Sequence, residues 1–514
     1  MTNTTREFKR QLPVNATFQS MAFLIRVGVG IWLVPYLVDH LGTAAYGLIP
    51  IAALMTQYAS LISNSISVAL NRYLTMALHQ GDPDDANRVY STAFFTFLTV
   101  GALQAPLFAL AIAHAGKLVN IPDELYRDAQ LLLVFSAAAF IVNLMASVYT
   151  VPMYAFNRLD ISRGIDMARI LLRLVGIVAI FGTMGPALKY VGYVDLGIAL
   201  ICLFLQRSAS RRLAPALAIR PRFFEWPKVR QVSGLSGWLL VNQVGSLLFL
   251  QMDVWVCNRF VDPASAGQYA ALLHWPSLLR QGGLTLASVV APMIMIYYTR
   301  NEMEQLVRLS TASVRILSLA ISVAVVILCT LSGPLLGLWL GDAYMELAPL
   351  MMVMLLHLAV NVGVTPLFNV QVAVQKVKLP AVVTLVGGIA NLMIAIYLAR
   401  YMGWGLYGVA AAGAIVLTAK NFLFTTLYAA YILQLPWLTF MRPCISAFYC
   451  TVALGAMGYG IVRVAAPESL AALVLTALAM GLAGVVMSWF LLPGCNRNQL
   501  YDMMRSRLPG MRAH

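Results

Sequence analysis

The feature that most constrains this chain is a succession of apolar stretches, each about as long as a bilayer is thick. A helix of about 20 apolar residues spans the hydrocarbon core of a membrane. Such stretches occur at residues 16–38, 44–69, 91–114, 129–151, 165–186, 189–206, 234–258, 266–298, 313–340, 347–372, 380–400, 407–432, 443–463 and 470–492. A membrane-spanning helix satisfies its own backbone hydrogen bonds, so the pattern predicts an all-α polytopic membrane protein with about 14 transmembrane helices.

Composition excludes the soluble classes of protein. Hydrophobic residues make up 60% of the chain and charged residues 11%, whereas soluble domains are about 25% charged. A mean hydropathy of +0.79 leaves no room for a large soluble domain. We therefore exclude a soluble enzyme, a nucleic-acid-binding module and a peripheral amphipathic protein, and expect no nucleic-acid partner despite the net charge of +15.

The net positive charge is explained by the membrane topology, because most Lys and Arg residues lie in connections on one side of the membrane. Alternate connections between the predicted spans hold 24 Lys and Arg residues in one set and 6 in the other. Short loops rich in Lys and Arg stay in the cytoplasm. The sequence therefore predicts a multi-pass protein of the plasma (inner) membrane, with both termini cytoplasmic. The six on the predicted outer side are Lys117, Arg127, Lys189, Arg259, Arg400 and Arg463.

Motifs for catalysis or for metal and cofactor binding are lacking in the sequence. There is no H-E-x-x-H, G-x-S-x-G or P-loop, and the six cysteines are scattered without a C-x-x-C. One G-x-G-x-x-G, at Gly403, Gly405 and Gly408, joins two predicted spans and is read as a tight turn. We predict no enzyme activity, no catalytic residue, no cofactor and no metal site.

Two pairs of similar segments indicate an internal duplication. Residues 38–46 can be aligned with 261–269, and residues 155–160 with 373–378, at offsets of 223 and 218. Halves with the same orientation place a central site between two lobes that alternate in access. We predict two pseudo-symmetric six-helix lobes plus two C-terminal helices. The expected parts are an N-terminal lobe (1–206), a basic cytoplasmic linker (207–233), a C-terminal lobe (234–432), and two further spans with a basic tail (433–514).

Several short motifs, in order, resemble a known family. They are Pro35, Leu41-Gly42, Tyr46-Gly47, Asn71-Arg72, Ala155-x-Asn157-Arg158, Gln251-x-Asp253, Gly267-x-Tyr269 and Gly405-Leu406-Tyr407-Gly408-Val409-Ala410. Together they resemble the polysaccharide-export (Wzx-type) flippases of the multidrug/oligosaccharidyl-lipid/polysaccharide superfamily. The resemblance covers about residues 10–432, and the last two spans are the least distinctive.

The resemblance implies a function. Flippases of this type move an undecaprenyl-diphosphate-linked oligosaccharide from the cytoplasmic to the outer leaflet, for cell-surface polysaccharides such as the O-antigen of lipopolysaccharide. It also implies membrane lipids, a polysaccharide polymerase and chain-length proteins as partners. Two alternatives within the superfamily stay open: a drug/cation antiporter and a flippase for the lipid-linked peptidoglycan precursor. A membrane-embedded glycosyltransferase would need a large outer loop, and the longest predicted outer segment, about 115–128, is short.

Ionisable residues inside the spans are the candidate site residues, because a charge at mid-membrane is costly and is normally functional. Arg26 and Arg280 lie deep in spans one and eight, and Lys420 lies in span twelve. Arginine suits phosphate recognition because its guanidinium binds bidentately. The resemblance implies a central cavity faced by an Arg in span one and another in span eight. We therefore predict that Arg26, Arg280 and Lys420 bind the diphosphate.

Three further residues have two interpretations each. Arg169 and Arg173, one turn apart in span five, either form an inner mouth for the substrate or extend to the cytoplasmic surface. Asp253 in span seven either couples an ion or neutralises an arginine. A structural role for Lys420, paired with a carbonyl or a lipid headgroup, also stays open.

Overall fold

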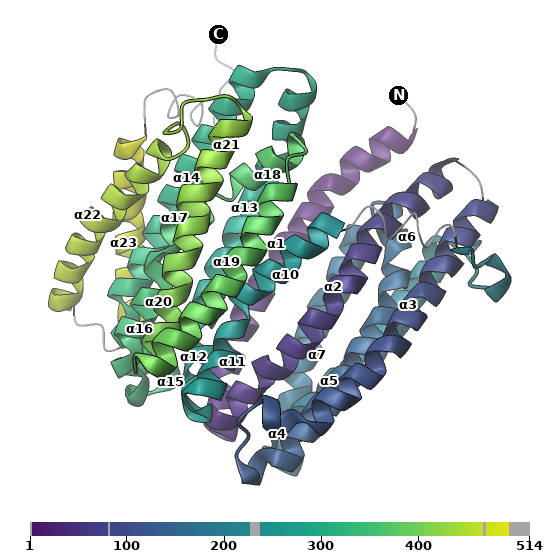
Figure 1. Ribbon diagram of the computed structural model, residues 1–514, viewed down its shortest axis with the longest axis horizontal. Coiled ribbons are helices and arrows are strands. Elements are labelled where there is room, and N and C mark those ends of the chain that lie inside the picture. The colour runs from purple at the N-terminus through teal and green to yellow at the C-terminus, as the bar shows by residue number, and fades with distance from the viewer. Residues whose placement is uncertain (1–2, 81–82, 227–236, 466–468, 493–514) are drawn as a thin grey trace. The chain divides into compact units, whose positions relative to one another are not determined.

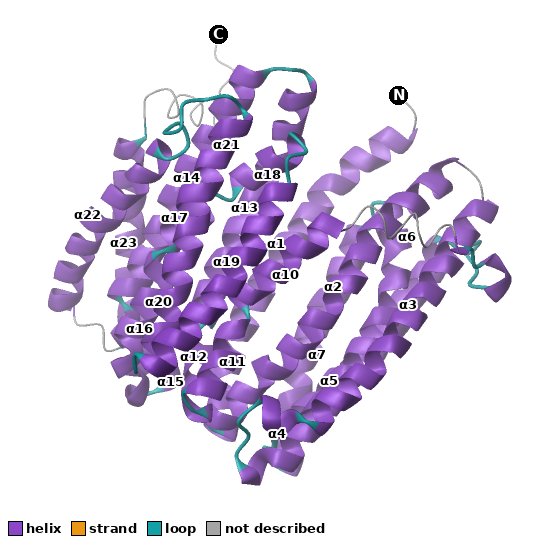
Figure 2. Cartoon of the chain, in the orientation of Figure 1, coloured by secondary structure: helices purple, strands orange, loops and turns teal. Residues whose placement is uncertain are grey.

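The apolar stretches fold into helices throughout the part of the chain that the computed structural model describes, residues 3–80, 83–226, 237–465 and 469–492. Those residues contain helices, turns and loops but no β-strand (Figure 2). The chain divides into two compact units, Met1–Ala271 and Leu272–His514. Figure 1 shows unit 1 in purple to teal and unit 2 in teal to yellow.

Unit 1 contains long helices joined by short turns. Its elements are α1 (Asn3–Leu41), α2 (Thr43–Gln80), α3 (Pro83–Ala113), α4 (Ala115–Leu118), η1 (Asp123–Leu125), α5 (Tyr126–Ser147), η2 (Val148–Thr150), α6 (Val151–Ala155), α7 (Leu159–Met184), α8 (Leu188–Leu213), η3 (Pro221–Phe223), α10 (Gly237–Leu250), α11 (Met252–Phe260) and α12 (Pro263–Leu272), whose last residue belongs to unit 2.

Unit 2 is built in the same way. Its elements are α13 (His274–Thr299), α14 (Met303–Thr330), α15 (Ser332–Leu340), η4 (Asp342–Leu347), α16 (Ala348–Leu356), α17 (Leu358–Gly363), α18 (Pro366–Ala373), α19 (Lys378–Ile396), η5 (Tyr397–Tyr401), α20 (Gly405–Thr418), η6 (Ala419–Thr425), α21 (Thr426–Ile432), α22 (Arg442–Ala465) and α23 (Leu470–Leu491).

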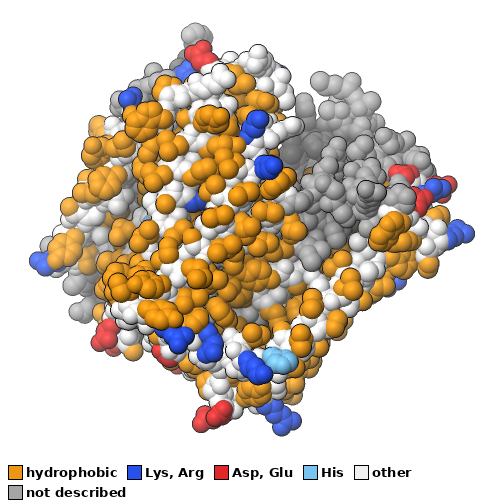
Figure 3. Space-filling view, in the orientation of Figure 1, with side chains coloured by type: hydrophobic (Ala, Val, Ile, Leu, Met, Phe, Trp, Pro, Cys, Tyr) orange, Lys and Arg blue, Asp and Glu red, His pale blue; other side chains and the backbone are white. Residues whose placement is uncertain are grey.

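The predicted membrane spans are confirmed. Among the described residues, 13 helical segments are long and apolar enough to cross a membrane. The bent pair Leu240–Leu250 and Met252–Phe260, which meets at 45°, brings the number to 14 if it forms one span. The protein is thus an all-α, multi-pass membrane protein. Figure 3 shows the expected surface on unit 2, where the visible face is largely apolar.

Close backbone contact joins the start of α2 to the start of α12 within unit 1. A Cβ atom added to Gly267 would overlap the carbonyl oxygen of Thr43, and one added to Gly47 would lie 2.8 Å from the Gly267 nitrogen. Only a residue without a side chain allows backbones to approach this closely. The two segments that the sequence aligns as repeats, 38–46 and 261–269, therefore meet at this point.

The loop after α4, which the charge pattern predicts to lie outside, is attached to α11 by two asparagines. The Asn120 backbone N–H donates to Asn258 Oδ1 at 2.8 Å, and Asn120 Nδ2 donates to the Asn258 carbonyl oxygen at 2.8 Å. In return, Asn258 Nδ2 donates to the Asn120 carbonyl oxygen at 3.1 Å. The Asn258 side-chain amide thus both accepts from and donates to the Asn120 backbone, in the reciprocal way that two paired strands exchange hydrogen bonds.

In unit 2, α14 is the central helix and packs against α13, α16, α17, α22 and α23. Its core side includes buried apolar residues such as Val314 and Leu319, and buried serines lie among them along the helix. Ser310, Ser318 and Ser322 are all fully buried. Small residues at helix interfaces let backbones approach closely in membranes, which explains how five helices pack around one.

The predicted domain boundaries stay a prediction. The compact units divide after Ala271, so α10 and α11, which form the predicted seventh span, pack with unit 1. Residues 227–233 of the predicted linker and 493–514 of the predicted tail lie outside the described residues.

Candidate functional site

Arg169 and Arg173 line a cavity of about 310 Å³ inside unit 1. Four helices form its wall, with residues from α2, α5, α7 and α8. The two arginines lie one turn apart on α7 and therefore on the same face. The polar lining residues are Thr56, Ser136, Asn143, Arg169, Arg173 and Asp195.

An ion pair between α7 and α8 holds Arg173 in place. Its Nε lies 2.9 Å from Asp195 Oδ1, and an Nη atom donates to Asp195 Oδ2 at 3.2 Å. One charge-assisted hydrogen bond and one close ion-pair contact therefore join the guanidinium to the carboxylate. Asp195 was missed in the sequence, although an acid inside the predicted span 189–206 was a usable signal.

Arg169 has a neutral partner instead. It donates to Asn143 Oδ1 on α5 at 3.1 Å. The nearest acid on its own helix, Asp166, contacts Arg163 at 3.3 Å. The cavity therefore holds two guanidinium groups and one carboxylate, a formal excess of one positive charge. Such a site favours an anionic group over a cation.

Arg280 occupies a polar cluster in unit 2. It lies on α13, half-buried, and its charge acts on His357 at the junction of α16 and α17. One turn later Gly283 brings α13 against α17, because a Cβ atom there would overlap the Val362 side chain. The close approach of the two helices thus positions Arg280 beside the buried end of α17.

Hydrogen bonds extend this cluster to η6. Asn361 Nδ2 lies 2.8 Å from His357 Nδ1 and donates to Thr418 Oγ1 at 3.1 Å. Asn421 Nδ2 donates to the Asn361 carbonyl oxygen at 3.3 Å. The amide oxygens of both asparagines are buried and have no donor among the described residues. The sequence pattern indicated neither asparagine.

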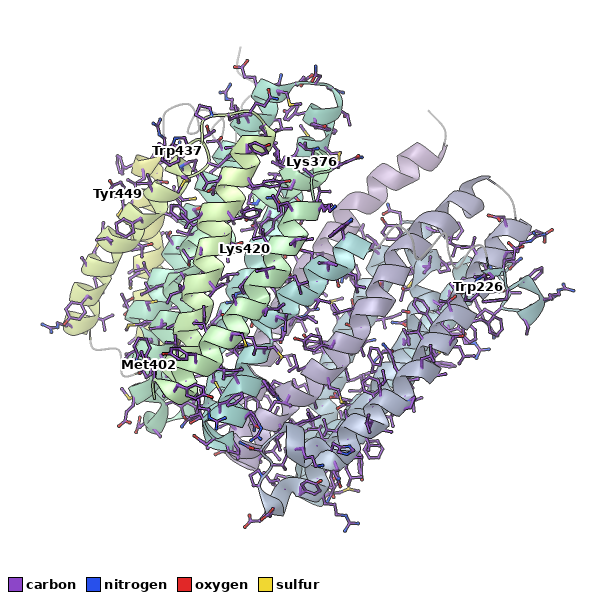
Figure 4. All side chains as sticks on the ribbon, viewed as in Figure 1. Trp226, Lys376, Met402, Lys420, Trp437 and Tyr449 are labelled. Atoms are coloured by element: carbon purple, nitrogen blue, oxygen red, sulfur yellow. The ribbon has the colours of Figure 1, made fainter. Side chains whose placement is uncertain are left out.

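Lys420 lies on η6, a π-helical segment that follows α20. Its Nζ is 4.6 Å from the centre of the Phe368 ring on α18, a cation–π contact. Figure 4 shows Lys420 between Lys376 and Met402, which lie towards opposite ends of unit 2. π-Helical turns are rare and are frequently found at functional sites.

Two predicted residues lie elsewhere in unit 1. Arg26 is on α1 with an exposed side chain, and it does not line the 310 Å³ cavity. Asp253 is buried in the first turn of α11 and accepts a hydrogen bond from Tyr269 Oη at 3.0 Å. Arg26 belongs to unit 1, and Arg280 and Lys420 to unit 2. Joint binding of a diphosphate by these three therefore stays a prediction.

The fold is shared with solved transporters and flippases. A lipid II flippase MurJ in an inward closed conformation matches with a TM-score of 0.68 and 12% identity, over 95% of this chain and 100% of that one. An inward-facing multidrug resistance MATE transporter of the MOP superfamily matches with a TM-score of 0.61 and 13% identity, over 82% and 98%. Vibrio cholerae VcmN, a MATE transporter in a bent form, gives 0.52 and 14%, over 87% and 99%.

Sequence comparison reaches the family itself. The membrane protein EpsK of Bacillus subtilis (strain 168) is 31% identical over 424 residues, which are 82% of this chain and 83% of EpsK. A family model described as "Polysaccharide biosynthesis protein" matches residues 40–349. The fold is that of membrane transporters and not that of an enzyme. The chain belongs to the polysaccharide biosynthesis protein family of membrane proteins.

Proposed function

We propose that this protein is a flippase that moves an undecaprenyl-diphosphate-linked oligosaccharide from the cytoplasmic to the outer leaflet of the plasma membrane. The cargo has an acyl tail that can stay in lipid, while its diphosphate and sugars need a polar path. Alternating access would supply that path without exposing the headgroup to the hydrocarbon core. A polysaccharide polymerase and chain-length proteins would then act on the exported unit.

The observation that carries the proposal is the charge of the spans. The predicted spans contain nine basic residues against the three acids Asp166, Asp195 and Asp253. Four of the nine, Lys189, Arg315, Arg400 and Arg463, lie within three residues of a span end, and the other five are Arg26, Arg169, Arg173, Arg280 and Lys420. Two of the acids have arginine partners, since Asp166 contacts Arg163 and Asp195 contacts Arg173. An excess of positive charge within the spans stabilises an anion such as a diphosphate. A drug/cation antiporter would need the opposite balance.

The membrane potential would drive this transport in the right direction. The cell interior is negative, so an anion that moves outward gains about 2.3 kcal/mol per charge per 100 mV. A diphosphate therefore needs no stoichiometric ATP hydrolysis for net export. A coupled ion would add to this drive.

The proposal is tested by the pair of variants Arg26→Ala and Arg280→Ala. A charged hydrogen bond contributes about 1.5–3 kcal/mol, so each variant should reduce export about tenfold or more. Lysine at either position should restore only part of the activity, since a point charge replaces a planar fork. Surface polysaccharide is measured in cells that lack the native gene and carry each variant, with membrane abundance measured in parallel.

Arg400→Ala is the matched control, because Arg400 lies at the exposed end of η5. It should leave export unchanged. Normal polysaccharide in a well-expressed Arg26→Ala/Arg280→Ala double variant would contradict the proposal. A loss of resistance to cationic drugs, with polysaccharide intact, would favour the antiporter instead.

A further inference from the structure

A second cavity in unit 1, of about 730 Å³, lies at the end of α8 that the charge pattern predicts to be cytoplasmic. Its wall comes from α3, η2, the last turns of α8 and the loop that follows. On one side Tyr90 Oη and Ser210 Oγ are hydrogen-bonded at 3.2 Å. Phe94 and Tyr149 add aromatic surface. The cavity thus offers both hydroxyl groups and apolar rings.

The basic residues of this cavity are two arginines on one helix face. Arg207 and Arg211 lie four residues apart in the last turns of α8, and both line the cavity with exposed side chains. No carboxylate is among the described residues that line it. The last carbonyl groups of α8 add only partial negative charge. A ligand with a phosphate group would complement this site, because arginine binds phosphate through two parallel hydrogen bonds.

The loop that completes the cavity is fixed to α3 by side-chain hydrogen bonds. Asn87 Oδ1 accepts from the Ala218 N–H at 2.7 Å. Ser91 Oγ donates to the Ala218 carbonyl at 3.1 Å and accepts from the Arg220 N–H at 3.1 Å. Further along, Arg88 pairs with Glu225 at 2.9 Å. The cavity is therefore preformed, and a ligand would not have to order its wall.

Two exposed aromatic residues indicate that this part of unit 1 lies at the membrane surface. Phe224 is 38% exposed and Trp226 is 71% exposed, at the end of the same loop. The Phe224 ring meets Phe95 of α3 edge-on, with ring centres 6.3 Å apart. Figure 4 shows Trp226 at the edge of unit 1. Tryptophan next to basic residues is typical of the headgroup layer of a membrane. This placement favours a lipid headgroup as the ligand of the cavity over a soluble molecule.

We propose that this cavity binds the phosphate-bearing headgroup of an anionic phospholipid of the cytoplasmic leaflet. Arg207 and Arg211 hold the phosphate, and the hydroxyl groups of Tyr90 and Ser210 lie within the cavity that receives the rest of the headgroup. Basic pockets between membrane helices on the cytoplasmic side are suited to this role. The bound lipid is a resident of unit 1, separate from the transported cargo, so the proposal does not depend on the cargo.

The test uses the full-length protein in mixed micelles of detergent with phosphatidylglycerol, phosphatidylcholine or soluble glycerol 1-phosphate. Bound lipid is counted by native mass spectrometry, and the melting temperature is followed in parallel. Each basic residue contributes about fivefold in affinity for an anionic lipid surface. Arg207→Gln/Arg211→Gln should therefore weaken phosphatidylglycerol binding by about 25-fold. Phosphatidylcholine should bind weakly to both proteins.

Arg212→Gln is the matched control, since Arg212 is exposed in the same turn but does not line the cavity. It should bind as the unchanged protein does. Arg207→Lys/Arg211→Lys keeps the charge and should recover part of the binding, which separates loss of a site from misfolding. Equal phosphatidylglycerol retention by the Gln double variant would overturn the proposal. Glycerol 1-phosphate that stabilises the protein as well as the lipid does would overturn it in favour of a soluble phosphate ligand.

Discussion

At the scale of single residues, the charges inside the membrane occur in defined partnerships. Arg173 is held by a carboxylate, Arg169 by an amide and Lys420 by an aromatic ring. These partners differ in charge, so the three cations differ in the interaction energy that they lose when they leave the partner to bind an anion. Arg173 loses an ion pair, which is the strongest of the three interactions, and Lys420 loses only a cation–π contact. We expect Arg169 and Lys420 to respond to an anionic cargo before Arg173 does.

Asp195→Asn tests the role of the Arg173 pair. The substitution leaves Arg173 charged beside a neutral amide and should lower the melting temperature in detergent. Asp195→Asn/Arg173→Gln should lower it less, because removal of both charges leaves neither one uncompensated. Since both side chains are about a third exposed, solvent screening keeps the effects small, about 1 kcal/mol.

The matched control is another ion pair that involves α8. Asp128 on α5 and Lys189 on α8 form a single contact at 3.3 Å and do not line the 310 Å³ cavity. Asp128→Asn should change the melting temperature by no more than a degree or so. If Asp195→Asn/Arg173→Gln were less stable than Asp195→Asn alone, the prediction that Arg173 and Asp195 are coupled would be wrong.

At the scale of elements, helix contacts in this protein depend on glycine where backbones meet. The starts of α2 and α12 meet at Gly47 and Gly267, and α13 meets α17 at Gly283. Hydropathy predicts where the membrane helices lie in the sequence, but it does not predict how closely two helices approach each other. The repeat alignment predicted that residues 38–46 and 261–269 are equivalent segments, but it did not predict a contact between them.

Gly267→Ala tests the first of these contacts. Its Cβ would overlap the Thr43 carbonyl, so the backbones must separate, at a cost of about 1–3 kcal/mol. We expect a melting temperature several degrees lower, measured on the purified protein in detergent. Gly197→Ala on α8 is the control, since its Cβ would meet nothing within 4 Å; alanine in a helix should there raise stability. Equal melting temperatures for the two variants would contradict the prediction.

At the scale of the whole molecule, the sequence predicted the spans well, because hydropathy is a local property of the chain. All 14 predicted spans coincide with described helical segments, the seventh being the bent pair α10 and α11. Side-chain partnerships were harder to predict. The pairing of Arg173 with Asp195 depends on how α7 and α8 are rotated about their axes. Likewise Asn361 and Asn421 meet through hydrogen bonds between elements 60 residues apart.

Membrane topology is the prediction that belongs to the whole chain. Labelling of single introduced cysteines with a membrane-impermeant maleimide can test it, because the five described native cysteines are buried. Glu124, exposed after the predicted outer loop, should react in intact cells as Glu124→Cys. Ala216→Cys, exposed after α8, should react only after the cells are opened. Labelling at residue 216 in intact cells would reverse the predicted orientation.

The contacts between Asn120, in the predicted outer loop, and Asn258, on α11, have a consequence for how this family can vary. The Asn258 side-chain amide accepts from and donates to the Asn120 backbone. The Asn120 side-chain amide donates to the Asn258 carbonyl oxygen and accepts from Arg259 Nη1. Neither aspartate nor leucine can replace either amide, because each one both donates and accepts. Surface loops normally tolerate insertions and drift in sequence. This one should instead keep its length in relatives. Each asparagine should be retained independently of the other, because each side chain binds the other residue's backbone. Insertions and deletions between α4 and η1 should therefore be rare among homologues.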